Sequence, residues 1–411
     1  MPLPPMHYSS IASGAATAGQ WGVIALGLSI PVSVALDNIL IGLIALLWLL
    51  SGNWRGKAAA VRQNPVAIAA LVLFGLLAVG TTYGNGDTGV LLKYIDLLLI
   101  PVFLTFFQDA RTRERALLAF CIAAVASVAV SHLAYLNLLS QSSLLPREAY
   151  YPIGFKGSIT HSLIVALSAY LFALYAREEP NRTYRVGCIA LALTAAHNVV
   201  FMGWGRTAYL VLGILFLYFF VVTLGRRGLA AFCALAVAIL ATAYISSATF
   251  QQRITDFAQQ LRGWQPGVPS DDSVGERFEF FINSLRLVRE HPLAGSGTGS
   301  FPAEYARIVA DQNMLATVNP HNEYVLIAVQ IGVLGLASLI YLFYRQWRYA
   351  GELAPPFYRD LARGLVLTFI VGCLFNSLLL DHTEGLLFAW LTALVFAAPA
   401  KPVPLPARAV A

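Results

Sequence analysis

Stretches of about twenty apolar residues recur along the whole chain, and each is long enough to cross a hydrocarbon layer of roughly 30 Å. Because no water inside a bilayer can hydrogen-bond the main chain, such stretches must be helical. Only 12% of the 411 residues are charged, against roughly 25% in a soluble domain. The sequence therefore predicts an all-α polytopic membrane protein.

Hydropathy predicts about twelve transmembrane helices. The predicted spans are 15–33, 35–51, 65–83, 89–107, 115–138, 158–176, 185–203, 207–224, 229–248, 321–344, 362–380 and 383–399. Residues 1–248 thus hold the first nine spans, residues 321–400 hold the last three, and residues 401–411 form a tail. Between them, residues 249–320 form one large loop domain outside the membrane.

Lys and Arg gather in alternate connections, around residues 55–62, 111–115, 177–185, 226–227, 345–363 and 401–408. The positive-inside rule assigns these connections, and both termini with them, to the cytoplasm. The N-terminal segment has no Lys or Arg before the first apolar run, and a signal peptide usually has such a positive charge there. We therefore expect this segment to be retained. The long loop then lies outside, because long loops cross a membrane largely regardless of their charge.

Several classes of function are disfavoured. The net charge of +6 comes from basic residues scattered between spans, without the basic stripe and interleaved aromatics of a nucleic-acid site. The segment HPLAGSGTGSF, residues 291–301, lacks the Lys-Ser/Thr ending of a nucleotide-binding loop, so we expect a flexible turn. Asp271 and Asp272 are the nearest approach to a metal-binding pair, and two adjacent carboxylates are a weak signal. We therefore predict no metal site.

The large loop begins polar and continues as a helical pattern over residues 276–291, in which Phe278, Phe281 and Leu285 recur at three- and four-residue spacing. The glycines that follow are expected to break this helix, and a second short helix is expected over 302–312. A loop this long in a compact protein is usually functional.

Two arginines are candidates for binding an anionic group at the outer interface, because a planar guanidinium suits phosphate. Arg206 lies in a short connection between two apolar spans, and Arg277 lies near the start of the amphipathic helix. Each has a purely structural alternative. Arg206 could reach lipid headgroups, and Arg277 could pair with Glu276 or Asp272.

A polar cluster, residues 319–323, stands directly before an apolar run. Within it, Asn319 or Asn322 could cap the helix, which would leave His321 as an interfacial histidine with no further role. The alternative is a general base, since an ordinary His pKa near 6.5 suits proton abstraction at neutral pH. The polar segment 381–384 is also on the outer side, where it could belong to a site, but it is expected to close a short hairpin. Further candidate substrate-lining groups on the outer side are Lys93, Arg147, Lys156 and Asn322.

Three pieces of the sequence occur in an order that resembles the O-antigen ligase family: GRTAYL, GERFEFFINSLRLVREHPLAGSGTGSF and NPHNEYVLIAVQIGVLGL. That family shares a superfamily with O-antigen polymerases and protein O-oligosaccharyltransferases. The topology is similar over most of the chain, and the specific motifs run from Arg206 to Gly335. One departure is Gly205, where family members often have serine.

The resemblance implies a GT-C-like glycosyltransferase of the bacterial inner membrane with a periplasmic active site and no metal, cofactor or nucleotide. It implies transfer, with inversion, of a glycan from undecaprenyl diphosphate to a sugar hydroxyl of the lipid A–core oligosaccharide. Arg206 and Arg277 would bind the diphosphate, and His321 would be the base.

An O-antigen polymerase or a protein O-oligosaccharyltransferase would use the same three residues. A lipid-linked glycan transporter or flippase without chemistry is the alternative from another class. Transporters tend to place ionisable groups near the bilayer midplane, often in repeated halves. Here the polar groups gather at one face and the sequence has no repeat, which favours an enzyme.

Overall fold

The computed structural model describes residues 6–84, 86–138, 154–203, 205–246, 248–265, 268–270, 272–311 and 314–398, and these contain helices but no strands. The helices are α1 (Met6–Ser29), α2 (Val34–Leu50), α3 (Trp54–Gln63), α4 (Pro65–Gly80), α5 (Val90–Lys93), α6 (Asp96–Phe106), α7 (Ala110–Tyr135), α8 (Ser158–Glu178), α9 (Arg182–His197), the π-helix η1 (Asn198–Met202), α10 (Arg206–Leu224), α11 (Arg226–Ser246), α12 (Ala248–Gly263), α13 (Gly275–Glu290), α14 (Phe301–Val309), α15 (Glu323–Ala350), α16 (Pro356–Gly372) and α17 (His382–Phe396).

The chain is a polytopic membrane protein whose described residues form helices only. Each of the twelve predicted spans contains a helix. By length and composition, seven described helices could cross a membrane, and an eighth if α2 and α3, bent by 115°, form one broken span. The helices α4 and α17 are apolar but shorter, at 16 and 15 residues. The helices are therefore confirmed, while the number that cross the membrane stays a prediction.

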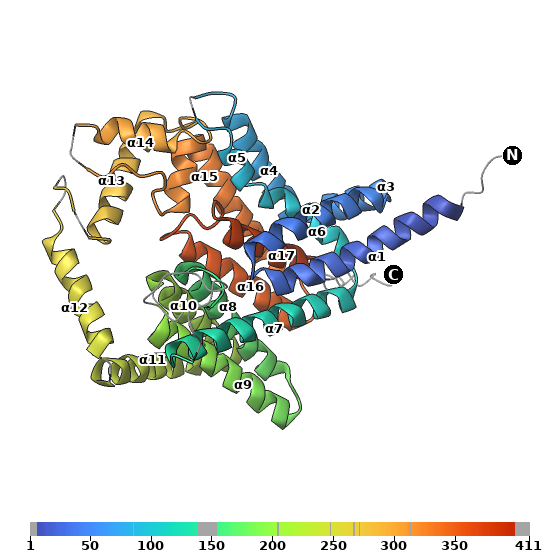
Figure 1. Cartoon of the computed structure of the whole chain (residues 1–411), viewed down its shortest axis with the longest axis horizontal. Helices are drawn as coiled ribbons and strands as arrows, with labels where there is room; N and C mark the ends of the chain where they lie inside the picture. Colours follow the sequence, from blue (N-terminus) through green and yellow to red (C-terminus); the bar gives the residue numbers. More distant parts are fainter. Residues whose placement is uncertain are drawn as a thin grey trace, which may run out of the picture.

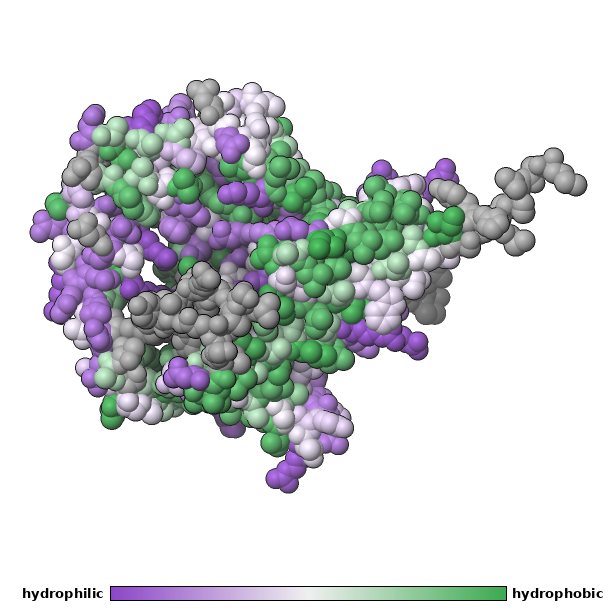
Figure 2. Space-filling view, viewed as in Figure 1, coloured by the Kyte–Doolittle hydropathy of each residue, from purple (hydrophilic) through white to green (hydrophobic). Residues whose placement is uncertain are grey.

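The helices of the large loop lie together on one side of the molecule. Figure 1 shows α12, α13 and α14 at the left, opposite the N-terminal end of α1. Figure 2 shows hydrophilic residues along that left edge, where the surface is hollowed, and hydrophobic residues over much of the remainder. The predicted loop helices are confirmed as α13 and α14, and the polar start of the loop forms the additional helix α12.

The buried face of α13 differs from the apolar stripe in the sequence. Phe278 and Phe281 remain 37% and 38% exposed, whereas Phe280 and Leu287 are buried. The polar Asn283 is also buried and donates to the Tyr305 hydroxyl on α14 at 3.4 Å. Spacing alone does not show which face is buried, because the contacts of α13 with α14 and α15 decide it.

The helix α15 is broken in its middle at Ile331 and Gly332, whose φ angles are −133° and 63°. A break inside a membrane helix requires other partners for the main-chain groups that it frees. Here the glycine-rich segment provides them. The N–H groups of Ser296 and Gly297 donate to the Val329 and Gln330 carbonyls at 2.8 and 2.9 Å.

The glycine-rich segment forms turns, as expected, and it also packs closely against other parts of the chain. Gly297 and Gly299 have positive φ angles of 100° and 84°. A Cβ atom on Gly297 would lie 2.2 Å from the Tyr83 carbonyl oxygen, and one on Gly299 would lie 2.1 Å from that of Asp87. The glycines therefore allow close main-chain contact, which joins the large loop to the connection between α4 and α5.

The predicted span 362–380 is also shorter than expected. The helix α16 ends at Gly372, and residues 373–381 form a non-helical connection to α17. The main-chain N–H of Leu379 donates to the Glu323 carboxylate at 2.9 Å instead of continuing a helix. Because the residues of this connection are largely apolar, hydropathy did not separate them from the span.

Lys156, a candidate substrate-lining residue, lies in a buried ion pair. Its Nζ is 3.1 Å from Oδ2 of Asp37, and the two side chains are 5% and 0% exposed. The same ammonium donates to the Thr383 hydroxyl at 3.3 Å, and Ser29 donates to the other oxygen of Asp37. These bonds tie the start of α8 to the starts of α2 and α17.

Replacing Lys156 with alanine should lower the free energy of unfolding by about 3–5 kcal/mol, because it leaves the Asp37 carboxylate buried without its counter-ion. Removing both charges in the double variant Asp37→Asn/Lys156→Met should recover most of this loss. Unfolding in lipid nanodiscs would measure both effects. The control is Arg307→Ala, which removes an exposed ion pair with Glu290 and should change stability by less than about 1 kcal/mol. Equal losses for Lys156→Ala and the control would contradict the prediction.

Candidate active site

Arg206 is positioned by a local irregularity of the main chain between α9 and α10. After α9 the chain forms the π-helix η1, a conformation that is often found at functional sites. Asn198 at its start is buried, and its carboxamide bonds both His161 on α8 and Ser131 on α7. The N–H of Gly203 donates to the Asn198 carbonyl at 2.7 Å, and α10 then begins at Arg206.

The side chain of Arg206 is exposed at the N-terminus of α10, where the helix dipole favours anions. Its guanidinium carbon lies 5.9 Å from the ring centre of Phe257 on α12. A Cβ atom on Gly205 would lie 3.2 Å from the Cβ of Ser162, so the glycine fits this position more easily than a serine would.

Arg277 lies in the first turn of α13, which Asp272 caps by accepting hydrogen bonds from Val274 and Gly275. Its guanidinium donates to the Phe375 carbonyl at 3.4 Å, and among the described residues it forms no ion pair. Burial lowers the pKa of Arg277, and the positive charge of Arg206 lowers it further. The two guanidinium groups are therefore within electrostatic range of each other.

His321 occupies a left-handed conformation with φ = 53°, which is uncommon for a residue other than glycine. Its N–H donates to the side-chain oxygen of Asn319 at 2.9 Å, and its ring stacks on Phe280 of α13 with centres 6.2 Å apart. Within the described part of the chain, no hydrogen bond occupies its ring nitrogens. Burial lowers the pKa of His321, and the charge of Arg277 lowers it further. Both effects favour the neutral form of the imidazole.

The structure brings the three sequence candidates Arg206, Arg277 and His321 together from three separate elements. Arg277 is the central member, because its charge lowers the pKa of His321 and the charge of Arg206 lowers the pKa of Arg277. The arrangement offers two positive charges for an anion and an imidazole for a proton. The described residues contain no group of three or more His, Cys, Asp or Glu that could hold a metal ion.

The other candidates have different surroundings. Lys93 is exposed at the end of α5. Burial of Asp381 raises the pKa of that carboxyl, and the positive charge of Lys93 partly offsets this rise. Asn322 caps α15 by accepting from the Val325 N–H at 3.0 Å, and its amide donates to the Leu374 carbonyl at 3.0 Å. Arg147 lies outside the described residues.

Sequence reasoning missed a buried network directly behind His321. The Glu323 carboxylate is fully buried and accepts from the Tyr94 hydroxyl at 3.0 Å. Gln330 donates to the same Tyr94 oxygen at 3.4 Å and accepts from the Gly299 N–H at 2.8 Å. The one available signal was a carboxylate at the head of an apolar run.

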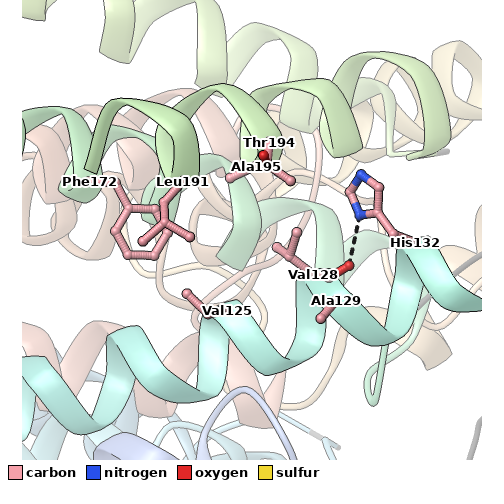
Figure 3. A pocket seen from close by; sticks show the side chains of 8 residues that line it. All are labelled: Val125, Val128, Ala129, His132, Phe172, Leu191, Thr194 and Ala195. Carbon is pink, nitrogen blue, oxygen red and sulfur yellow. Dashed lines mark hydrogen bonds between the residues drawn. The ribbon is translucent and has the colours of Figure 1, made fainter. Parts of the chain in front are cut away.

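A cavity of about 200 Å³ lies between α7, α8 and α9, and none of these three residues lines it. Figure 3 shows its lining, which is almost entirely apolar, with Phe172 at one end and His132 at the other. His132 bonds the Val128 carbonyl at 2.8 Å, within its own helix.

Residues 189–340 match the model of the protein family described as O-antigen ligase. The chain carries an O-antigen ligase family domain. This ligase-family domain includes Arg206, Arg277 and His321, together with α12, α13 and α14. None of the curated proteins compared with the chain matches it. Family members are ligases and polymerases that act by glycosyl transfer on lipid-linked glycans, which supports a glycosyl-transfer enzyme.

Proposed function

We propose that this protein is an O-antigen ligase that transfers a glycan from undecaprenyl diphosphate to a sugar hydroxyl of the lipid A–core oligosaccharide. The observation that carries the proposal is the central place of Arg277, within electrostatic range of both Arg206 and His321. Two cations and a neutral imidazole at one place match the needs of this reaction, because its leaving group is an anion and its nucleophile must lose a proton.

The chemistry is a direct displacement. The acceptor oxygen bonds to the anomeric carbon of the donor glycan as the bond from that carbon to the diphosphate breaks, which inverts the anomeric centre. The leaving electron pair stays on undecaprenyl diphosphate, whose negative charge Arg206 and Arg277 stabilise. Fixed donors aimed at developing charge contribute more to catalysis than flexible ones because they need no reorganisation. The hydroxyl proton passes to a ring nitrogen of His321.

The site is assigned to the periplasmic face of the bacterial inner membrane, with both termini in the cytoplasm. The distribution of Lys and Arg along the chain supports this orientation. The position of α12, α13 and α14 opposite the start of α1 is in accord with it (Figure 1). Both lipid-borne substrates would then meet at the outer leaflet.

Reconstitution tests the function directly. The purified protein in liposomes, given undecaprenyl-linked glycan and lipopolysaccharide that lacks O-antigen, should transfer the glycan to the core oligosaccharide in the presence of a metal chelator. Heat-inactivated protein is the control. Extension of the glycan on its own lipid carrier, without lipopolysaccharide, would identify a polymerase. Transfer only to protein would identify a protein-directed enzyme. Movement of the donor across the bilayer without transfer would identify a transporter.

A further inference from the structure

Residues 373–379, which we call the 373–379 connector, contact the elements that carry all three site residues. On the α13 side, the Phe375 carbonyl accepts from Arg277 at 3.4 Å. On the α10 side, the Asn376 carboxamide donates to the Thr207 hydroxyl at 3.1 Å, next to Arg206. These contacts join segments that are far apart in the sequence.

On the α15 side, the contact of the connector reaches His321 through one intermediate. Ser377 donates its hydroxyl to the side-chain oxygen of Asn319 at 2.7 Å, and that same oxygen accepts the N–H of His321 at 2.9 Å. The Asn319 carboxamide therefore holds the left-handed conformation of His321, and Ser377 holds the carboxamide. Ser377 is fully buried, so water does not replace its hydroxyl.

We propose that Ser377 and Asn376 are positioning residues, which set His321 and Arg206 at opposite ends of one site. The inference rests on the function proposed above for His321 and Arg206. Ser377 acts through Asn319 on the base, and Asn376 acts through Thr207 on the first turn of α10. Both side chains are almost completely buried, so neither is exposed for direct contact with a substrate. Their separate routes predict separate kinetic effects.

Loss of the Ser377 hydroxyl should lower kcat, because His321 acts in the chemical step, and should leave the KM for the donor within twofold. The comparison uses Ser377→Val and Ser377→Thr, which share a shape and differ in the hydroxyl. We expect about a tenfold lower kcat for Ser377→Val and less than a threefold change for Ser377→Thr. Equal kcat values for the two variants would overturn the role of Ser377.

Loss of the Asn376 amide should weaken donor binding, since it frees the turn that presents Arg206. For Asn376→Ala we expect at least a fivefold higher KM for the donor and a fivefold higher Kd for undecaprenyl diphosphate alone. In an Arg206→Ala background, Asn376→Ala should add no further loss, while Ser377→Val should add its full effect. Full additivity of Asn376→Ala would overturn its role. The control is Ser338→Ala, which removes a buried hydroxyl without a partner from α15 and should change neither constant.

These outcomes separate failure of the inference from failure of the proposed function. If the unmodified protein transfers no glycan to lipopolysaccharide, the proposed function fails, and the Kd for undecaprenyl diphosphate still tests Asn376. If the unmodified protein is active and the Ser377 and Asn376 variants differ only in melting temperature, with kcat and KM unchanged, the connector is a structural element and the inference fails.

Discussion

His321→Ala is expected to reduce glycan transfer by at least about a hundredfold while the lipid-linked donor still binds. A positioned general base contributes roughly 10²–10⁴-fold to a rate. Transfer to lipopolysaccharide by the purified variant would measure the loss. His291→Ala, at the exposed end of α13, is the matched control and should keep full activity. Normal transfer by His321→Ala would remove this residue from the mechanism.

The same histidine predicts the pH dependence of the reaction. Burial and the charge of Arg277 both lower the pKa of His321 below its ordinary value of about 6.5. The neutral form is the base, so kcat should be constant at neutral pH and fall only as the pH drops through the lowered pKa. Arg277→Gln removes a positive charge, so the remaining activity should fall at a higher pH than in the unmodified protein. An unchanged acid limb would contradict the coupling.

Arg277→Ala is expected to reduce transfer by at least about tenfold, and by up to about 10³-fold if the guanidinium acts fully on the developing diphosphate charge. Arg206→Ala should act in the same direction. Lysine at either position should restore activity only in part, because it lacks the planar fork that bonds two phosphate oxygens.

The matched control for these variants is Arg286→Ala, which removes an exposed arginine from the same helix as Arg277 and should leave activity within twofold. Full activity of Arg277→Lys and Arg206→Lys would indicate that these residues provide only general positive charge at the lipid surface. Initial rates at saturating acceptor, with the donor varied, would separate weaker binding from slower chemistry.

Much of the candidate site could be predicted from the sequence, because its residues have unusual types for their places. An arginine between two apolar spans, an arginine in an external amphipathic helix, and a histidine before an apolar run stand out without coordinates. The helices α13 and α14 were also predicted, within a few residues of their bounds. Which face of α13 is buried was not, since spacing gives a periodicity but not its partner.

The sequence could not distinguish structural polar groups from functional ones. Lys156 was a candidate for lining the substrate, yet it pairs with Asp37, which is 119 residues away in the chain. Asn322 is a helix cap and a tether to Leu374. Such pairs depend on which helix ends meet, and no local pattern records that.

By itself, the sequence determined that this is a helical membrane protein and singled out Arg206, Arg277 and His321 as candidate site residues. It did so because the bilayer allows a long apolar segment only one conformation, and because charged groups are rare in such a chain. Only the tertiary structure decided that α16 ends at Gly372, that the glycine-rich segment fills the break in α15, and that the 373–379 connector joins the three site elements. The physical reason is that these contacts are hydrogen bonds between residues far apart in the chain, which form only once the helices have packed.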